Sequence, residues 1–184
     1  GVSIEYGGIV DEAQESFRSL RKSMAIAFLI ILILLSAQFR SLLQPLIIAF
    51  TIPLAFVGVV FGLMITRVPF GLMAFFGLVA LTGVVVNDAI ILISHINDLR
   101  DEGMPFTDAI IQGGKHRLRP IILTTVTTIA GMIPLTLDFV GGAEYWRPLA
   151  VSIIFGLGMA TLLTLIVVPV LYSFIVRVKK PAIS

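Results

Sequence analysis

Apolar residues gather in five long blocks along this chain of 184 residues, and short polar segments separate the blocks. A helix needs roughly 20 apolar residues to cross the hydrocarbon core of a bilayer. The pattern therefore predicts five transmembrane helices, at about residues 23–39, 42–66, 71–97, 120–137 and 148–176. The expected fold class is an all-α integral membrane protein with one membrane domain, 23–176.

Polar segments flank this membrane domain. We expect residues 1–22 to lie outside the hydrocarbon, as a short strand over Val2–Tyr6, where apolar and polar residues alternate, and a connecting helix over Ile9–Lys22. Residues 105–116 are expected to form a short helix on the cytoplasmic membrane surface. Residues 177–184 form a basic tail that we place in the cytoplasm.

The second block contains residues that shape a helix. Pro53 lies inside it, and an internal proline removes a backbone hydrogen bond, which predicts a kink. Gly58 and Gly62 are four residues apart, so they leave one face of the helix without side chains and let another helix approach closely. The alternative is that this spacing arose by chance, as it often does in membrane helices.

Composition supports a membrane protein and excludes other classes. The chain is 58% hydrophobic and 13% charged, whereas soluble domains are about 45–50% apolar and about 25% charged. A net charge of +2, without a basic stripe that alternates with aromatic residues, argues against a nucleic-acid partner. The chain has no cysteine, which excludes disulfides and thiolate metal sites.

Lysine and arginine are divided unevenly between the two sides of the predicted helices. The side of the carboxyl terminus collects Arg40, Arg100, Lys115, Arg117, Arg119, Arg177, Lys179 and Lys180. The loops of the other side hold only Arg67 and Arg147. Because cytoplasmic loops carry the excess of these residues, we expect the carboxyl terminus inside and the amino-terminal segment outside. Arg18, Arg21 and Lys22 oppose this rule, and a large preceding external domain would allow them.

Asp88, with Asn87 beside it, interrupts the third apolar block. From Gly71 to Ile96 the only other ionisable side chain is His95. A charge at the centre of a membrane helix costs about 2.5–3.5 kcal/mol on insertion scales, and a carboxylate avoids much of that cost by binding a proton. An acid that can be neutral or charged at this depth suits proton transport. The alternative is a structural acid that bonds a neighbouring helix.

The predicted spans give no support for enzymatic activity. An intramembrane aspartyl protease needs two carboxyl groups in one site, and Asp88 is the only acid within a predicted span. The six methionines show no clear track of metal ligands. We therefore expect no enzymatic activity, no metal site and no cofactor, with the proton motive force as the energy source.

Four sequence blocks resemble the resistance-nodulation-division (RND) efflux transporters, in their AcrB-like hydrophobe/amphiphile branch. The blocks are Gly83–Ile90 (GVVVNDAI), Arg117–Thr125 (RLRPIILTT), Gly131–Leu135 (GMIPL) and Trp146–Ala150 (WRPLA). Any one of them alone would be a weak signal, but their combination in this order is specific. The resemblance covers essentially the whole chain.

The resemblance implies that the chain is part of a larger transporter. The chain looks like the last five of twelve transmembrane helices, half of an RND transmembrane bundle, preceded by the end of a periplasmic loop. Such a transporter is a multi-pass trimer in the bacterial inner membrane, and it takes up protons while it expels drugs and other small amphiphilic substrates. Its implied partners are membrane lipid, the amino-terminal helices and periplasmic domains of the same protein, an adaptor protein and an outer-membrane channel.

The resemblance also implies roles for single residues. Asp88 stands where these transporters have a proton-relay group, and Asn87 stands at a position that often holds a lysine in this half of the family's proteins. In the family that lysine pairs with aspartates of the other half as a switch. Asn87 puts that switch in question here but leaves the expected location of the relay unchanged. Thr124 falls at a relay hydroxyl and Arg117 at an arginine below the relay. For Thr124 the alternative is a bond to its own helix, and for Arg117 it is a charge that sets topology.

Two other functions remain open from the sequence. The protein-translocation members of the same superfamily also carry an aspartate on a middle helix, although the RLRP and WRPLA blocks favour efflux. The second alternative is a membrane scaffold that transports nothing.

Overall fold

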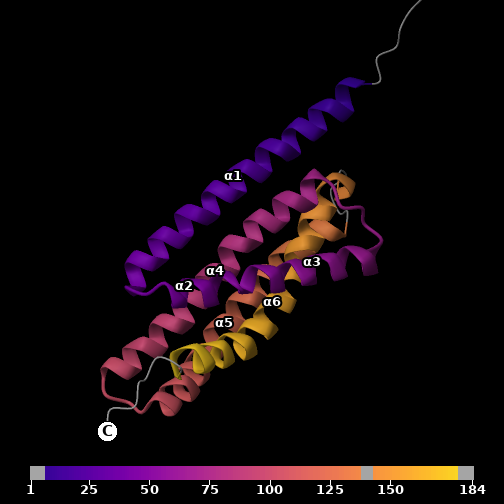
Figure 1. Ribbon diagram of the computed structural model, residues 1–184. Coiled ribbons are helices and arrows are strands. Elements are labelled where there is room, and N and C mark those ends of the chain that lie inside the picture. The colour runs from indigo at the N-terminus through magenta and orange to yellow at the C-terminus, as the bar shows by residue number, and fades with distance from the viewer. Residues whose placement is uncertain (1–6, 138–142, 178–184) are drawn as a thin grey trace, which may run out of the picture.

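The computed structural model describes residues 7–137 and 143–177, and all regular structure in them is helical. The helices are α1 (Gly7–Phe39), α2 (Leu43–Ala49), α3 (Thr51–Thr66), α4 (Leu72–Asp101), α5 (Phe106–Thr136) and α6 (Ala143–Arg177) (Figure 1). The strand expected over Val2–Tyr6 lies outside the described residues.

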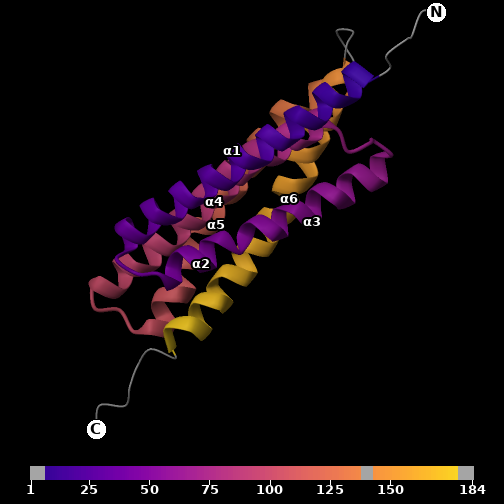
Figure 2. The same cartoon turned by 45° about the horizontal axis from the view of Figure 1, so that its top comes forward.

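Within residues 7–137 and 143–177, five helical segments are long and apolar enough to cross a membrane. They are Gln14–Phe39, Leu43–Thr66, Leu72–Asp101, Phe106–Thr136 and Glu144–Phe174. The prediction of an all-α membrane fold with five spans is therefore confirmed. The second span comprises α2 and α3, which run through the bundle one after the other (Figure 2).

Proline explains the break inside the second span. The break falls at Phe50, three residues before Pro53. Proline has no N–H for the carbonyl four residues earlier, here that of Ala49, and its ring crowds the same carbonyl. The helix therefore ends at Ala49 and restarts at Thr51, where the sequence predicted a kink.

The helix α5 differs from expectation because it is continuous. The sequence suggested a surface helix at 105–116 and a separate span from Pro120, but both belong to Phe106–Thr136. Two small residues of the first part, Ala109 and Gly113, are buried, and a Cβ on Gly113 would lie 2.6 Å from Ile96 of α4. This part packs on protein, which holds it in line with the span.

The core of the bundle forms where α6 packs against α3, α4 and α5. Glycines allow the closest contacts: a Cβ added to Gly58 would lie 2.6 Å from Met159, and one added to Gly62 would overlap Phe155. From the opposite helix, a Cβ on Gly156 would overlap Leu81 of α4. The structure thus places α6 directly on the Gly58–Gly62 face of α3.

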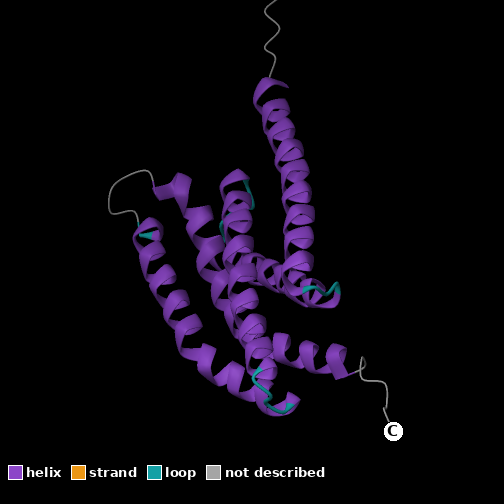
Figure 3. Cartoon of the chain, turned by 90° about the vertical axis from the view of Figure 1, so that its left-hand side faces the viewer, coloured by secondary structure: helices purple, strands orange, loops and turns teal. Residues whose placement is uncertain are grey.

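By contrast, α1 stands apart from the bundle along most of its length (Figure 3). Only 6% of the most apolar stretch of its span is buried. It touches the bundle mainly near its carboxyl end, where Leu35 joins a buried cluster with Ile47, Ile48 and Ala89. The packed core is therefore formed by α2 to α6, and α4 carries the acid of interest.

Candidate functional site

Asp88 lies near the middle of α4 and is buried. Its exposed fraction is 8%, and its neighbours Val85, Val86 and Ala89 are even less exposed. Most residues of α4 are apolar, and this helix packs against α6. The same packing buries the side chain of Asp88. Within the described residues no hydrogen bond reaches this carboxyl group from another side chain.

The packing register of α4 and α6 shows what lies level with Asp88. The two helices pair residues that are 75 apart in sequence: Gly77 meets Ser152, Leu81 meets Gly156, and Asn97 bonds Tyr172. The same register sets Asp88 level with Leu163 and Ala89 level with Thr164.

Hydroxyl groups gather at this level of the bundle. Thr164 is 1% exposed, and its Oγ1 atom has no hydrogen-bond partner in the described part of the chain. One turn earlier on α6, the Oγ1 atom of Thr161 lies 2.8 Å from that of Thr125 in α5, and both side chains are buried. A buried hydroxyl without a partner is less stable than one that is bonded. Thr164 is therefore suited to bind a group that is present during only part of a transport cycle.

Two residues predicted to belong to the relay lie on different surfaces from Asp88. Asn87 is exposed although Asp88 is buried, because successive residues of a helix point in different directions. Thr124 is also exposed, and its hydroxyl donates to the backbone carbonyl of Ile121 at 2.9 Å. Within the described residues, the structure does not bring either side chain into the buried site.

Arg117 lies nearer the end of the bundle. Its side chain is partly exposed, but its Nε atom is buried without a partner among the described residues. The preceding residue, His116, places its Nδ1 atom 3.3 Å from the Nε2 atom of His95 in α4. The structure therefore brings Arg117 close to a histidine pair rather than to Asp88.

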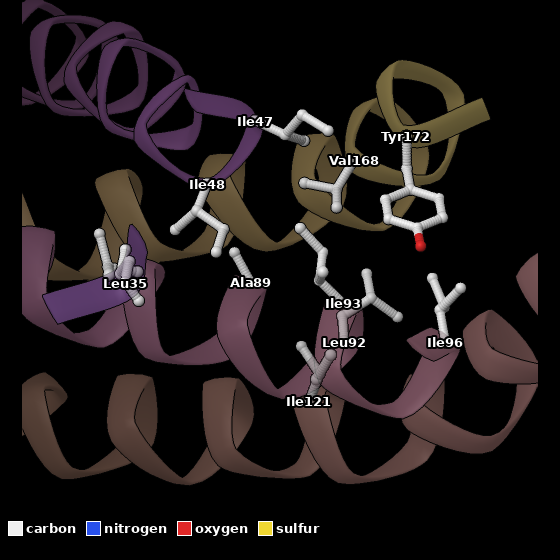
Figure 4. Close-up of a cluster of buried hydrophobic side chains, with 11 residues drawn as sticks. Leu35, Ile47, Ile48, Ala89, Leu92, Ile93, Ile96, Ile121, Val168 and Tyr172 are labelled. Carbon is white, nitrogen blue, oxygen red and sulfur yellow. The ribbon is translucent and has the colours of Figure 1, made fainter. Parts of the chain in front are cut away.

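An apolar layer separates Asp88 from this end of α4. Figure 4 shows Ala89, Leu92, Ile93 and Ile96 of α4 facing Val168 and Tyr172 of α6, with Ile121 of α5 on the other side. All of these side chains are at most 3% exposed. A proton cannot cross this layer without rearrangement of the helices or entry of water.

Beyond the apolar layer is a polar network that joins three helices. The hydroxyl of Tyr172 donates to Oδ1 of Asn97 at 2.6 Å and accepts from Nη1 of Arg100 at 2.9 Å. The Nδ2 atom of Asn97 donates to Oε1 of Gln44 in α2 at 3.0 Å. The ring of Phe106 stacks on Tyr172, with centroids 6.1 Å apart. This network ties the ends of α2, α4 and α6 together.

Sequence reasoning missed Thr161, Thr164 and the network. A signal for the two threonines was present, since polar residues three apart on an apolar span lie on one face. The network had no such signal, because its partners are 53 to 75 residues apart. Among the described residues there is no group of three or more His, Cys, Asp or Glu side chains that could hold a metal ion.

The sequence matches a known family over almost its full length. Residues 1–176 fit the family described as AcrB/AcrD/AcrF. The swarming motility protein SwrC of Bacillus subtilis is 36% identical over 180 residues, which are 97% of this chain and 17% of SwrC. The cobalt-zinc-cadmium resistance protein CzcA of Cupriavidus metallidurans is 34% identical over 172 residues, 94% of this chain and 16% of CzcA.

Further relatives differ in their described roles. The multidrug resistance protein MdtC of Erwinia tasmaniensis is 38% identical over 130 residues, 70% of this chain and 13% of MdtC. A crystal structure of a heavy metal efflux pump superposes with a TM-score of 0.82 at 30% identity, over 91% of this chain and 16% of the pump. The chain thus spans about one-sixth of the length of the first relatives that it matches.

Proposed function

This chain belongs to the AcrB/AcrD/AcrF family of RND efflux transporters, and on that premise we propose that it is the part of a proton-coupled transporter in which Asp88 carries the proton. The observation that carries the proposal is the position of Asp88, an acidic residue that is 8% exposed and lies in the middle of a membrane helix. Ionisable residues inside membrane spans are rare and are typically functional.

The proposed mechanism is alternating access. Neutral Asp88 is compatible with the tightly packed interface between α4 and α6, whereas the charged form demands water or another polar partner. Binding and loss of the proton would therefore favour two different arrangements of these helices. Each proton that crosses the membrane potential supplies about 2.3 kcal/mol per 100 mV, which can drive export through the coupled movement of α4.

We place the transporter in the bacterial inner membrane with its carboxyl terminus in the cytoplasm. The excess of lysine and arginine on that side supports the orientation. By analogy with the family, we propose a homotrimer whose remaining helices and periplasmic domains complete the pathway, with an adaptor protein and an outer-membrane channel as partners. In such an assembly Asn87 and Thr124, which are exposed here, would face other helices of the transporter.

For the exported compound we propose a small amphiphilic substrate, in line with the relative MdtC, which is described as a multidrug resistance protein. The second candidate is a heavy metal cation, because CzcA is a cobalt-zinc-cadmium resistance protein and the superposed structure is a heavy metal efflux pump. Export from loaded proteoliposomes would separate the two, with a cationic dye in one set of vesicles and zinc or cobalt ions in the other.

The decisive variant is Asp88→Asn in the complete transporter, because it keeps the shape of the side chain and removes its proton exchange. We expect export and the accompanying proton flux to be abolished while assembly and expression stay normal. The measurement is dye-reported proton movement across proteoliposomes when substrate is added. Asp101→Asn changes an exposed acid at the end of the same helix and serves as the control.

The same experiment tests the alternatives. Undiminished, proton-coupled export by Asp88→Asn would refute the relay. A scaffold predicts no substrate-dependent proton flux even in the unaltered protein, and a protein-translocation member predicts proton-driven movement of polypeptides rather than of small compounds.

A further inference from the structure

A pair of histidines meets between two membrane helices. The Nε2 atom of His95 in α4 lies 3.3 Å from the Nδ1 atom of His116 in α5. The ring centroids are 5.5 Å apart, and the ring planes are inclined by 41°. A neutral imidazole carries one N–H and one free lone pair, so two imidazoles that meet nitrogen to nitrogen can share one proton between them.

The position of the pair relates it to Asp88. His95 follows Asp88 by seven residues, which is two turns of α4, so both lie on the same face of the helix and roughly 10 Å apart along it. His95 is partly exposed and His116 is exposed. The pair therefore lies two turns beyond the buried acid, toward the carboxyl end of α4, which we place on the cytoplasmic side.

The charged surroundings of the pair come from both helices that contribute to it. Three charged groups act electrostatically on His95. Arg117 belongs to α5, Asp98 belongs to α4, and Glu102 follows the last residue of α4. The buried Nε atom of Arg117 has no partner in the described part of the chain, and such an atom normally binds water. Two acids and one arginine thus act electrostatically on His95, and the arginine carries a buried N–H without a partner among the described residues.

We propose that His95 and His116 form a proton-exchange site through which the proton released by Asp88 leaves toward the cytoplasm. This inference rests on the function and orientation proposed above. Histidine suits the task because its ordinary pKa of about 6.5 lies close to cytoplasmic pH, so it can both accept and release a proton.

The transfer is balanced in protons. The carboxyl O–H of Asp88 breaks and an imidazole N–H forms, with water bridging the distance of roughly 10 Å between the two. The imidazolium then gives a proton to bulk water on the cytoplasmic side. The second imidazole accepts a hydrogen bond from the imidazolium through its free lone pair. The pair therefore binds one extra proton, and two positive charges do not lie side by side.

Chemical rescue tests this role directly. In the complete transporter, His95→Ala and His116→Ala should each slow substrate-driven proton release several-fold. Imidazole added on the cytoplasmic side should restore the rate, and the restoration should grow with the fraction of neutral imidazole, because only the neutral form can accept a proton. A purely structural role predicts no such dependence on pH. Lys115→Gln, an exposed change beside His116, is the control and should behave as the unaltered protein.

Zinc ions test whether the pair stays together in the working protein. Two nitrogens bound to one tetrahedral zinc ion, at about 2.0–2.1 Å each, lie about 3.4 Å apart, close to the separation seen here. Zinc added from the cytoplasmic side should therefore inhibit export of an amphiphilic dye, and a chelator should reverse the inhibition. His95→Gln and His116→Gln should both be insensitive to zinc, while zinc on the opposite side should have no effect.

The outcomes separate this inference from the function on which it rests. If Asp88→Asn abolishes transport but both histidine variants keep the full rate and the pH profile of the unaltered protein, the exchange site is refuted and the relay stands. If Asp88→Asn also transports normally, the proposed function itself has failed. If His95→Ala does not assemble, the variants of the exposed His116 supply both tests. The proposal is then overturned if imidazole does not rescue His116→Ala, or if zinc still inhibits His116→Gln.

Discussion

Two levels of α4 carry polar groups, and they differ in how fully those groups are bonded. At the first level, around Asp88, the hydroxyl of Thr164 has no partner among the described residues, and no side chain there bonds the carboxyl group. At the second level, the hydroxyl of Tyr172 both donates and accepts, and the amide of Asn97 bonds on both sides. The apolar layer of Leu92, Ile93 and Ile96 separates the two.

This difference assigns separate tasks to the two levels. A fully bonded network holds one arrangement, because breaking it leaves its partly buried groups unsatisfied. An incompletely bonded level can change partners, which proton transfer requires. We therefore interpret the network of Asn97 and Tyr172 as the fixed end of α4 and the level of Asp88 as its working part.

The largest expected effect on stability is that of Asn97→Leu. This change removes the acceptor of the Tyr172 hydroxyl, which keeps only its bond from Arg100, and it removes both bonds to the Gln44 amide. Each buried group left unsatisfied costs about 1–3 kcal/mol, so we expect the thermal unfolding of the detergent-solubilised transporter to shift to clearly lower temperature. Unchanged unfolding would mean that the network does not fix the end of α4.

Tyr172→Phe should have a smaller effect. The variant keeps the aromatic ring and its stacking on Phe106 and loses only the hydroxyl. Side-chain hydrogen bonds inside membrane proteins contribute on average about 0.6 and at most about 1.7 kcal/mol, so a stability loss in that range is expected while export continues. Full stability together with lost export would contradict the assignment of separate tasks to the two levels, because the network would then take part in transport.

The sequence was sufficient for the membrane elements and for the acid. Uninterrupted apolar runs predict the five spans because hydrocarbon tolerates little else, and Asp88 is conspicuous as the only carboxyl group in such a run. The continuity of α5 was not predictable, since Pro120 favours a boundary and only contact with Ile96 shows that Gly113 belongs to the bundle.

The polar partners depend on register, which a single sequence does not specify. Thr125 and Thr127 look alike in the sequence, but Thr125 bonds Thr161 in another helix, and Thr127 bonds its own backbone. Likewise, nothing in the sequence links His95 to His116 across the turn between α4 and α5. Such pairings depend on how closely the helices approach, as where Gly113 of α5 lies against Ile96 of α4 beside the histidines.

The smallest expected change in stability is that of Thr164→Val. This variant directly tests the level of Asp88, where the polar groups are incompletely bonded. Valine has nearly the same shape without the hydroxyl, so it removes an unsatisfied group and should alter the free energy of unfolding by less than about 1 kcal/mol, in the stabilising direction. Proton-coupled export should nevertheless slow, because we infer that this hydroxyl bonds water or Asp88 during the cycle. The measurement pairs thermal unfolding with proton flux in proteoliposomes, and Thr127→Val at an exposed position is the control. A more stable protein with unaltered flux would show that the hydroxyl is idle, and Asp88 would then have to exchange its proton without help from α6.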